Sequence, residues 1–246
     1  MPSRPDHFSA VARQYSAARP SYPGALVRRH FARLAPARIW EVGAGSGQLI
    51  RKLLPYAQQL VATDISRQML GKIGRQEQLR TAVRAAASSG LPSQSVDVIA
   101  VGQAYHWFRQ RQFWREASRV VRPGGQVVLL SYRQCHLRRE LDVLLQDYYQ
   151  QVIHDYWPAQ RQHVDQAYLT IPPPYPHTAR RADRLVYRWT LRQFVTYLRS
   201  ASAVKRYTEC HRNDPVDKLE AELRNHWRGR EVVTFPMTVM TVRLPS

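Results

Sequence analysis

Apolar residues follow two patterns along the chain, short continuous runs and helical spacing. Over about residues 38–132 the two patterns follow one another in turn. Short apolar runs predict buried strands, and segments with apolar residues three or four positions apart predict amphipathic helices. The predicted strands cover residues 38–42, 59–63, 81–86, 96–102 and 126–132. The predicted helices cover residues 46–54, 66–75 and 109–121, and a Pro-Gly-Gly turn stands at 123–125. Strands that alternate with helices of about ten residues indicate β–α–β crossovers and a buried parallel sheet.

Both flanks of this alternating region are predicted to be rich in helix. Residues 8–35 carry helical spacing that breaks at the Arg-Pro-Ser-Tyr-Pro run 19–23, which predicts two helices. Further along, an amphipathic helix is predicted over residues 138–156 and a stiff proline-rich connector over residues 171–176. The remaining predictions are strands over residues 185–189 and 231–244 and helices over residues 191–207 and 216–227.

Together these elements predict one α/β domain with a Rossmann-like, seven-stranded, mostly parallel sheet and helices on both faces. The expected parts are an N-terminal helical cap (1–36), a core (37–132), a helical lid insertion after the fifth strand (133–182) and a C-terminal segment that completes the sheet (183–246). Open α/β sheets bind ligands at the carboxyl ends of their strands. Because the insertion starts at that edge, we interpret it as a substrate lid, with a dimerisation arm as the alternative.

A glycine-rich loop, Gly-Ala-Gly-Ser-Gly, follows the first predicted strand and leads into a helix. Glycines allow the backbone to turn sharply and to approach a ligand without a side chain in between. Gly43, Ala44, Gly45 and Gly47 are therefore predicted to contact a cofactor.

Three features favour a nucleoside that carries an amino acid over a dinucleotide. The dinucleotide motif would place a glycine where Gln48 stands. Glu41 precedes the first glycine, and a buried carboxylate attracts an ammonium group but repels a pyrophosphate. Asp64 ends the second predicted strand, about 20 residues further on, where a carboxylate accepts hydrogen bonds from ribose hydroxyls. The cofactor predicted from these residues is S-adenosylmethionine.

Four later residues are added to this predicted cofactor site. Ile65 and Met69 are expected to pack on the adenine, although a Met at helical spacing is also a common core residue. Ala87 is expected to border the adenine edge. Gln103 follows the fourth strand and is expected beside the methionine portion, facing the reactive methyl group.

Charge is the unusual property of the composition. The chain has 37 Lys and Arg against 18 Asp and Glu, a formal net charge of +19. Such an excess is typical of nucleic-acid binders, but the arginines are dispersed and form no polybasic block. An anionic small-molecule substrate would use the same residue type, because the arginine fork binds carboxylates and phosphates. A solvated basic surface without a specific partner is the third interpretation.

Cysteine content and hydropathy bear on metal binding and location. The chain has two cysteines, Cys135 and Cys210, which do not form a metal-binding motif, so no metal is expected. No apolar run approaches the ~20 residues of a membrane span, and the first residues are polar. We therefore expect a cytoplasmic protein without a membrane partner.

Several motifs resemble the class I methyltransferases of the "methyltransferase type 11" kind, above all the trans-aconitate and cantharidin-resistance methyltransferases. The matching segments are Tyr15-x-x-x-Arg19-Pro20-x-Tyr22-Pro23, the loop from Glu41 to Gly47, Asp64-Ile65-Ser66, Ser95-Val96-Asp97, Gln103-Ala104-Tyr105-His106-Trp107-Phe108, Arg122-Pro123-Gly124-Gly125, Tyr156-Trp157-Pro158 and Ser202-Ala203-Val204-x-x-Tyr207. Two positions depart from the family pattern. The segment before Gly90 lacks the usual acid, so Ala87 is expected to offer only its backbone, and Ala201 stands where relatives carry Trp.

The resemblance implies methyl transfer to a small-molecule carboxylate, which is ionised at neutral pH and needs no general base. Tyr15 and Arg19 are then expected at the cofactor, with Arg19 also the first candidate to bind the acceptor. The expected substrate residues are Tyr22, His106, Trp107, Arg133 and the arginines of the insertion. His106 is a candidate catalytic base, weighed against a packed histidine without a catalytic role.

Three other functions remain open on the sequence. An RNA methyltransferase would fit the basic charge, but the chain has Gln103-Ala104-Tyr105-His106 where amino-group methyltransferases of nucleic acids commonly carry Asn/Asp-Pro-Pro-Tyr. A methyltransferase acting on an acyl group held by an acidic carrier protein would also suit a basic surface. The third is a fold relative that binds the cofactor without catalysis.

Overall fold

The computed structural model describes residues 19–34 and 37–245 of the chain. Within these residues, seven strands form one sheet in the order β3-β2-β1-β4-β5-β7-β6. The strands are β1 Ala37–Val42, β2 Ala57–Asp64, β3 Leu79–Val83, β4 Val96–Gly102, β5 Val121–Tyr132, β6 Thr178–Trp189 and β7 Glu231–Arg243. The first five strands pair in parallel, and β7 pairs antiparallel with both β5 and β6. The predicted Rossmann-like, mostly parallel sheet is therefore confirmed.

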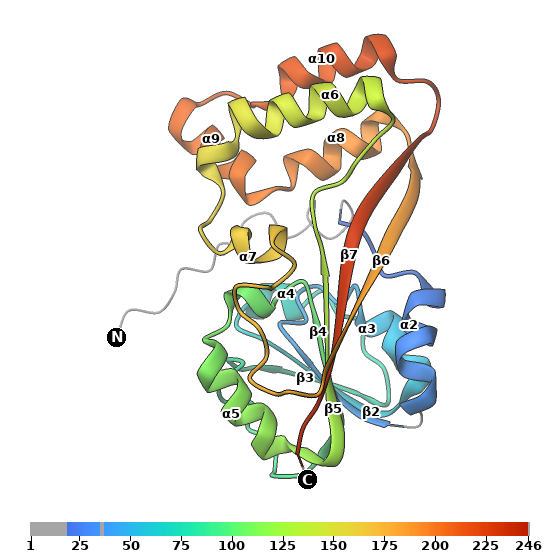
Figure 1. The fold of residues 1–246 in the computed structure, drawn as a ribbon, viewed down its shortest axis with the longest axis vertical. Coiled ribbons are helices and arrows are strands. Elements are labelled where there is room, and N and C mark those ends of the chain that lie inside the picture. The colour runs from blue at the N-terminus through green and yellow to red at the C-terminus, as the bar shows by residue number, and fades with distance from the viewer. Residues whose placement is uncertain (1–18, 35–36, 246) are drawn as a thin grey trace.

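Helices connect the strands and cover both faces of the sheet (Figure 1). Those around the sheet are α2 Gly24–Phe31, α3 Ile50–Leu53, α4 Arg67–Leu70 and α5 Gln110–Val120, with short 3-10 turns at Ala32–Leu34, Leu54–Tyr56 and Tyr105–Trp107. The others are α6 Arg139–Asp147, α7 Arg161–Asp165, α8 Leu191–Arg199, α9 Ser202–His211 and α10 Val216–His226. A π-helical turn at Tyr148–Val152 and a 3-10 turn at His154–Tyr156 continue α6.

The apolar runs of the parallel strands supply both faces of the sheet. Successive side chains of a strand point to opposite faces. In β4, Val98 joins the core on the α2 and α3 side, and Ile99 joins the core on the α5 side. Val128 and Leu129 of β5 divide in the same way. This two-sided burial explains why the strands read as continuous apolar runs.

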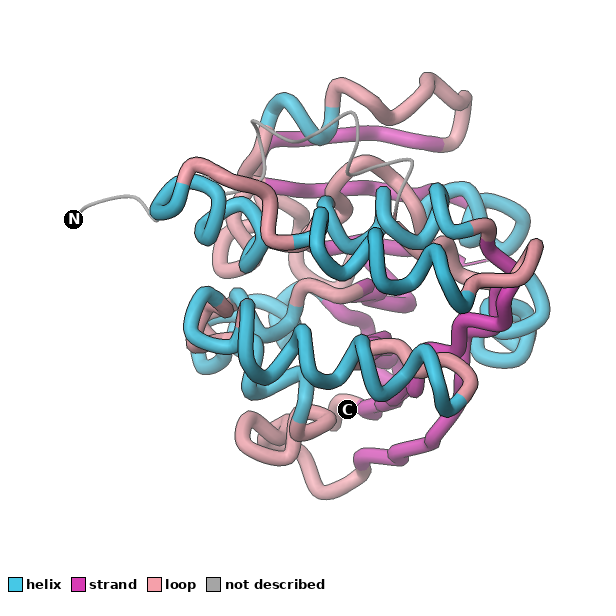
Figure 2. The backbone as a smooth tube through the Cα atoms, turned by 90° about the horizontal axis from the view of Figure 1, so that it is seen from above, coloured by secondary structure: helices cyan, strands magenta, loops and turns pink. Residues whose placement is uncertain are grey.

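A layer formed by α6, α8, α9 and α10 stands over the carboxyl ends of the parallel strands, with α10 packed on both α6 and α8 (Figure 1). Figure 2 views the molecule from the side of this layer. The long antiparallel pair β6–β7 runs from the sheet up to these helices. In this layer, α6 belongs to the predicted insertion, and α8, α9 and α10 belong to the C-terminal segment. Residues 178–182, expected within the lid, belong to β6, because β6 pairs with β7 along its whole length.

Several predicted elements differ in detail, among them the following three. The helix expected from Ser46 begins at Ile50, because the glycine loop continues as turns up to that point. The helix expected over residues 191–207 is two helices, α8 and α9. They meet near Ser200, whose Oγ donates to Tyr197 O in the last turn of α8 at 2.6 Å. The Pro-Gly-Gly turn is a bulge inside β5, since Val121 pairs with Val96 and Gln126 with Val98.

Within the described ranges, no helix is long and apolar enough to cross a membrane. The predicted first helix, before residue 19, lies outside the described residues.

Candidate active site

The glycine loop after β1 adopts backbone conformations that favour glycine. Gly43, Gly45 and Gly47 have φ angles of 67°, 55° and 84°. A methyl group added at Gly43 would lie 2.6 Å from Ala104 Cβ, so the loop passes close to the segment after β4. The main chain of Gly43 and Ala44 donates to Thr63 O of β2 at 2.8 and 3.0 Å. The loop is thus held between the ends of β2 and β4.

Asp64, the last residue of β2, braces this loop from the side. Its Oδ2 accepts from Gly45 N at 2.8 Å, and its Oδ1 accepts from Ser66 N at 2.9 Å. The side chain is half-buried beside the loop. The position matches the predicted place for a carboxylate that accepts from ribose hydroxyls.

Glu41 is a buried carboxyl beneath the loop, 2% exposed in β1. Burial and, to a smaller extent, the negative charge of Asp64 raise its pKa well above the usual value. Its Oε2 is buried without a hydrogen-bond partner among the described residues. A buried acceptor without a partner is costly. A ligand that brings hydrogen-bond donors or positive charge fits this position, and S-adenosylmethionine carries both.

The predicted adenine neighbours lie on two segments beside Asp64. Ile65 is 56% exposed, which leaves an apolar side chain open to a flat ring. Met69 is buried in α4, and its Cε lies 3.6 Å from the point where a Gly45 Cβ would be. Ala87 is half-buried, in a loop anchored by Ser89, whose N and Oγ both donate to Glu116 Oε1 at 2.8 and 2.5 Å.

Gln103 has a structural task that the sequence did not reveal. Its Nε2 donates to Tyr132 O, and its Oε1 accepts from Tyr132 N, each at 2.8 Å, which ties the ends of β4 and β5 together. Its φ of 54° is unusual for a residue with a side chain. Because its side-chain amide is engaged and its backbone N–H donates to Leu130 O at 2.8 Å, Gln103 offers a ligand mainly its backbone carbonyl.

The segment Arg19–Tyr22 connects the helical layer to the sheet. Arg19 Nη2 donates to Ser200 O at 3.2 Å, and the guanidinium lies 5.9 Å from the Tyr197 ring centroid. Tyr22 is buried at the end of β4, where its hydroxyl lies 2.9 Å from the place of a Gly102 Cβ. Arg19 and Tyr22 are therefore brought to the carboxyl edge, whereas Tyr15 lies outside the described residues.

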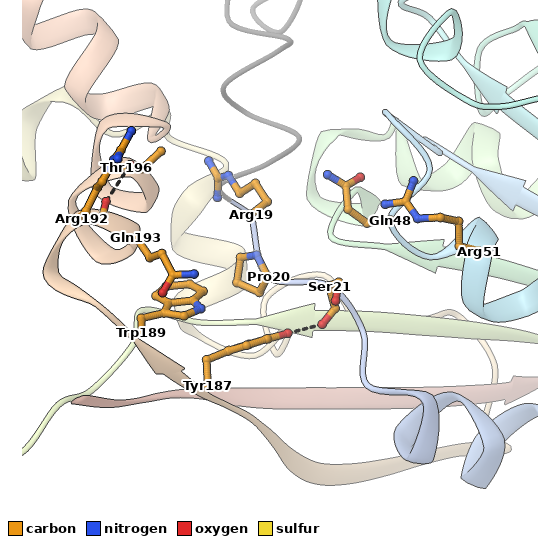
Figure 3. Close-up of a pocket in the computed structure, with 10 residues that line it drawn as sticks. All are labelled: Arg19, Pro20, Ser21, Gln48, Arg51, Tyr187, Trp189, Arg192, Gln193 and Thr196. Atoms are coloured by element: carbon orange, nitrogen blue, oxygen red, sulfur yellow. Dashed lines mark hydrogen bonds between the residues drawn. The ribbon is translucent and has the colours of Figure 1, made fainter. Parts of the chain in front are cut away.

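A pocket of about 370 Å³ opens between this segment, α8 and the start of α3 (Figure 3). Its lining residues are Arg19, Pro20, Ser21, Gln48, Arg51, Tyr187, Trp189, Arg192, Gln193 and Thr196. The lining includes three arginines, and none of the residues drawn in Figure 3 is acidic. Arg51 and Arg192 were not among the predicted site residues, because an exposed helical arginine carries no sequence signal of its own.

His106 sits in the 3-10 turn after β4 and is 7% exposed. Its Nδ1 lies 3.2 Å from the Tyr168 hydroxyl, and its ring centroid lies 5.0 Å from that of Trp107. Burial, with smaller contributions from the positive charges of Arg161, His163 and Arg19, lowers the pKa of His106 to about 3. The imidazole is therefore neutral at physiological pH and weakly basic.

Arg133, expected at the substrate, has an exposed side chain beyond β5 and is not among the pocket residues of Figure 3. Arg161 was covered only by the general expectation for arginines of the insertion. It lies in α7, which packs against the turn that holds His106. Among the described residues, no three His, Cys, Asp or Glu side chains gather as a metal site would require.

Comparisons with known proteins agree with this geometry. Residues 40–129, from β1 to β5, match the "Methyltransferase domain" family of type 11. A solved structure from Anaeromyxobacter dehalogenans, described as a type II methyltransferase, is 32% identical, with a TM-score of 0.82, and the match covers 93% of this chain and 99% of that chain.

Two relatives extend the comparison. A methyltransferase of Dictyostelium discoideum is 26% identical over 224 residues, which are 89% of this chain and 85% of that protein. The Saccharomyces cerevisiae S-adenosylmethionine-dependent methyltransferase CRG1 is 25% identical over 130 residues, 49% of this chain and 45% of that protein. The family match covers the glycine loop, Asp64 and the strands from β1 to β5. The chain belongs to the S-adenosylmethionine-dependent methyltransferases of the type 11 family.

Proposed function

We propose that this methyltransferase transfers the methyl group to a carboxylate of a small-molecule acceptor. The observation that carries the proposal is the pocket beside the glycine loop, where Arg19, Arg51 and Arg192 line one space (Figure 3). Arginine binds carboxylates through two parallel hydrogen bonds. Three such residues without an acidic side chain among them favour an anionic acceptor.

The cofactor residues have distinct proposed roles. Asp64 accepts hydrogen bonds from the ribose, and Glu41 receives the donors of the amino acid portion. Gly43, Ala44, Gly45 and Gly47 provide the close backbone approach. The adenine lies against Ile65 and Met69, with Ala87 at its edge, and Gln103 lines the methionine portion with its main chain.

The chemistry requires alignment more than proton transfer. When bound, S-adenosylmethionine supplies an electrophilic methyl group on a sulfonium. The arginines hold the acceptor and keep its carboxylate ionised, so no base has to remove a proton. Tyr22 closes the carboxyl end of β4, and the helical layer acts as a lid that excludes water. His106 and Trp107 shape the acceptor side, with His106 neutral rather than catalytic as a base.

The acceptor class also agrees with the family subgroup that the sequence motifs resemble. The Arg-Pro-x-Tyr-Pro and Gln-Ala-x-His-Trp-Phe runs of this chain resemble those of the trans-aconitate and cantharidin-resistance methyltransferases. The yeast relative CRG1 is similar over about half the chain. We therefore infer that this chain is the same kind of methyltransferase.

The test uses methyl-labelled S-adenosylmethionine and the purified protein, with a deproteinised cell extract and bulk RNA offered in parallel. We expect label in the small-molecule fraction and its loss under mild base, because methyl esters hydrolyse there. The product is then identified by mass. Base-stable label, or label only in RNA, would contradict a carboxylate acceptor.

A further inference from the structure

Arg161 is a largely buried arginine that the proposed chemistry has not yet used. It begins α7, between the helical layer and the sheet (Figure 1), and its side chain is 13% exposed. Its Nε donates to both carboxylate oxygens of Asp165, at 2.9 and 3.1 Å. Its guanidinium carbon lies 4.8 Å from the centroid of the Trp157 ring. These contacts fix the direction in which the guanidinium points.

One nitrogen of this guanidinium, Nη2, is left without a hydrogen-bond partner among the described residues. Asp165, which is 42% exposed, bonds only Nε of this guanidinium. Nη2 is buried and makes no hydrogen bond to any described residue. A buried charged donor without an acceptor is unfavourable, so the acceptor usually comes from another protein group or from a bound ligand.

The surroundings of Arg161 are those of the proposed acceptor side. The helix α7 packs against the turn Tyr105–Trp107, and Tyr168, just beyond α7, contacts His106 at 3.2 Å. The positive charges of Arg161 and Arg19 both act on His106 and on Tyr197. They add to the lowering of the His106 pKa by burial, and they partly oppose the raising of the Tyr197 pKa by burial. Arg19 itself lies over the Tyr197 ring. Two arginines from distant parts of the chain thus face the same histidine and tyrosine.

We propose that Arg161 is a specificity-determining residue whose Nη2 binds an anionic group of the acceptor from the side opposite to Arg19. The inference rests on the proposed small-molecule acceptor. The pocket arginines hold the acceptor from the α3 and α8 side, and Arg161 binds it from α7. Asp165 and Trp157 position the guanidinium, so the fork is ready before the acceptor arrives.

The experiment measures label transfer from methyl-labelled S-adenosylmethionine over a dilution series of the deproteinised extract. It compares the unchanged protein with Arg161→Gln, Arg161→Lys and the control Arg181→Gln, an exposed arginine of β6. We expect Arg161→Gln to need at least ten-fold more concentrated extract for half-maximal labelling. Arg161→Lys keeps the charge but not the fork and is expected to shift less, and Arg181→Gln not at all.

Two further readouts separate binding from folding and from the acceptor class. Cofactor affinity, measured by calorimetry with S-adenosylhomocysteine, should be the same in all four proteins. If labelling by Arg161→Gln falls by one factor at every extract concentration, or does not change, Arg161 does not bind the acceptor. Should Arg161→Gln fail to fold, the shift in Arg161→Lys decides. Base-stable label together with the expected shift would overturn the carboxylate acceptor but leave the role of Arg161 intact.

Discussion

The backbone N–H of Gly45 donates to Oδ2 of Asp64 at 2.8 Å, which joins the loop after β1 to the end of β2. The other oxygen of Asp64 accepts from Ser66 N at 2.9 Å. One carboxylate therefore shapes the glycine loop and stands where the ribose is proposed to bind. Changes at Asp64 should affect both the fold and the cofactor.

Replacing Asp64 with Asn tests this double role. The amide keeps one acceptor but turns a donor toward one of the two N–H groups, so we expect the protein to lose about 1–3 kcal/mol of stability. Affinity for S-adenosylhomocysteine, measured by calorimetry, should fall at least tenfold, or about 1.4 kcal/mol.

Asp97 provides the matched control for Asp64. It accepts from Arg38 N at 2.6 Å and from Arg122 Nη1 at 3.0 Å, at the amino end of the sheet and far from the loop. Asp97→Asn should lower stability without changing cofactor affinity. Equal affinity losses in the two variants would argue against a direct role for Asp64.

Alanine at Gly43 should be more harmful than alanine at Gly124, although both have positive φ angles, 67° and 77°. The added methyl at Gly43 would lie 2.6 Å from Ala104 Cβ, whereas nothing lies within 4 Å at Gly124. Gly124→Ala should cost only the backbone term, roughly 1–2 kcal/mol. Gly43→Ala should cost more and weaken cofactor binding. Urea unfolding with S-adenosylhomocysteine titration measures both, and similar losses at the two sites would show that the close contact is unimportant.

The pocket arginine Arg192 is expected to act on the acceptor alone. It lines the pocket from α8, an element separate from the glycine loop and from the end of β2. Losing one charge-assisted hydrogen bond costs about 1.5–3 kcal/mol. Arg192→Gln should therefore reduce kcat/KM for the acceptor roughly 10- to 100-fold, measured by transfer of label from S-adenosylmethionine. The exposed Arg188 of β6 serves as control, and an equal effect of Arg188→Gln would point to general charge instead of a site.

The buried histidine makes stability depend on pH in a defined direction. His106 has a pKa of about 3 in the folded protein, against the usual 6.5 of a free imidazole. Between these values the unfolded chain binds a proton that the folded chain does not, so stability rises with pH. The contribution of His106 is present above pH 6.5 and is lost as the pH falls toward 3. His106→Gln should flatten this part of the stability curve, with the exposed His154→Gln as control.

The same histidine separates two mechanisms. Removing a general base typically costs 10²–10⁴ in rate. A carboxylate acceptor needs no base, so His106→Asn should lower kcat less than about tenfold and leave cofactor affinity unchanged. The pH–rate profile should also lack an inflection from His106 near neutrality. A loss of a thousandfold would contradict the proposed role of His106.

Local sequence patterns determined the framework of this protein. The apolar run of β4 and the Gly-x-Gly-x-Gly spacing after β1 depend on nearby residues, because strand periodicity and positive φ angles are local properties. The position of Asp64 could be predicted for the same reason. Asp64 ends the strand that pairs in parallel with β1, so it lies at the same edge of the sheet as the glycine loop. The family and cofactor follow from these parts.

The acceptor side was decided by tertiary structure. Arg19 meets Arg192 and Arg51 in the pocket because the helical layer is built from two separate segments and folds back over the sheet. No local pattern distinguishes Arg51 or Arg192 from Arg133, which does not line the pocket. The side-chain amide of Gln103 likewise bonds the main chain of Tyr132 because the pairing of β4 with β5 brings the two residues together. The direction of a long polar side chain depends on which distant elements pack beside it, and only the folded chain brings those elements together.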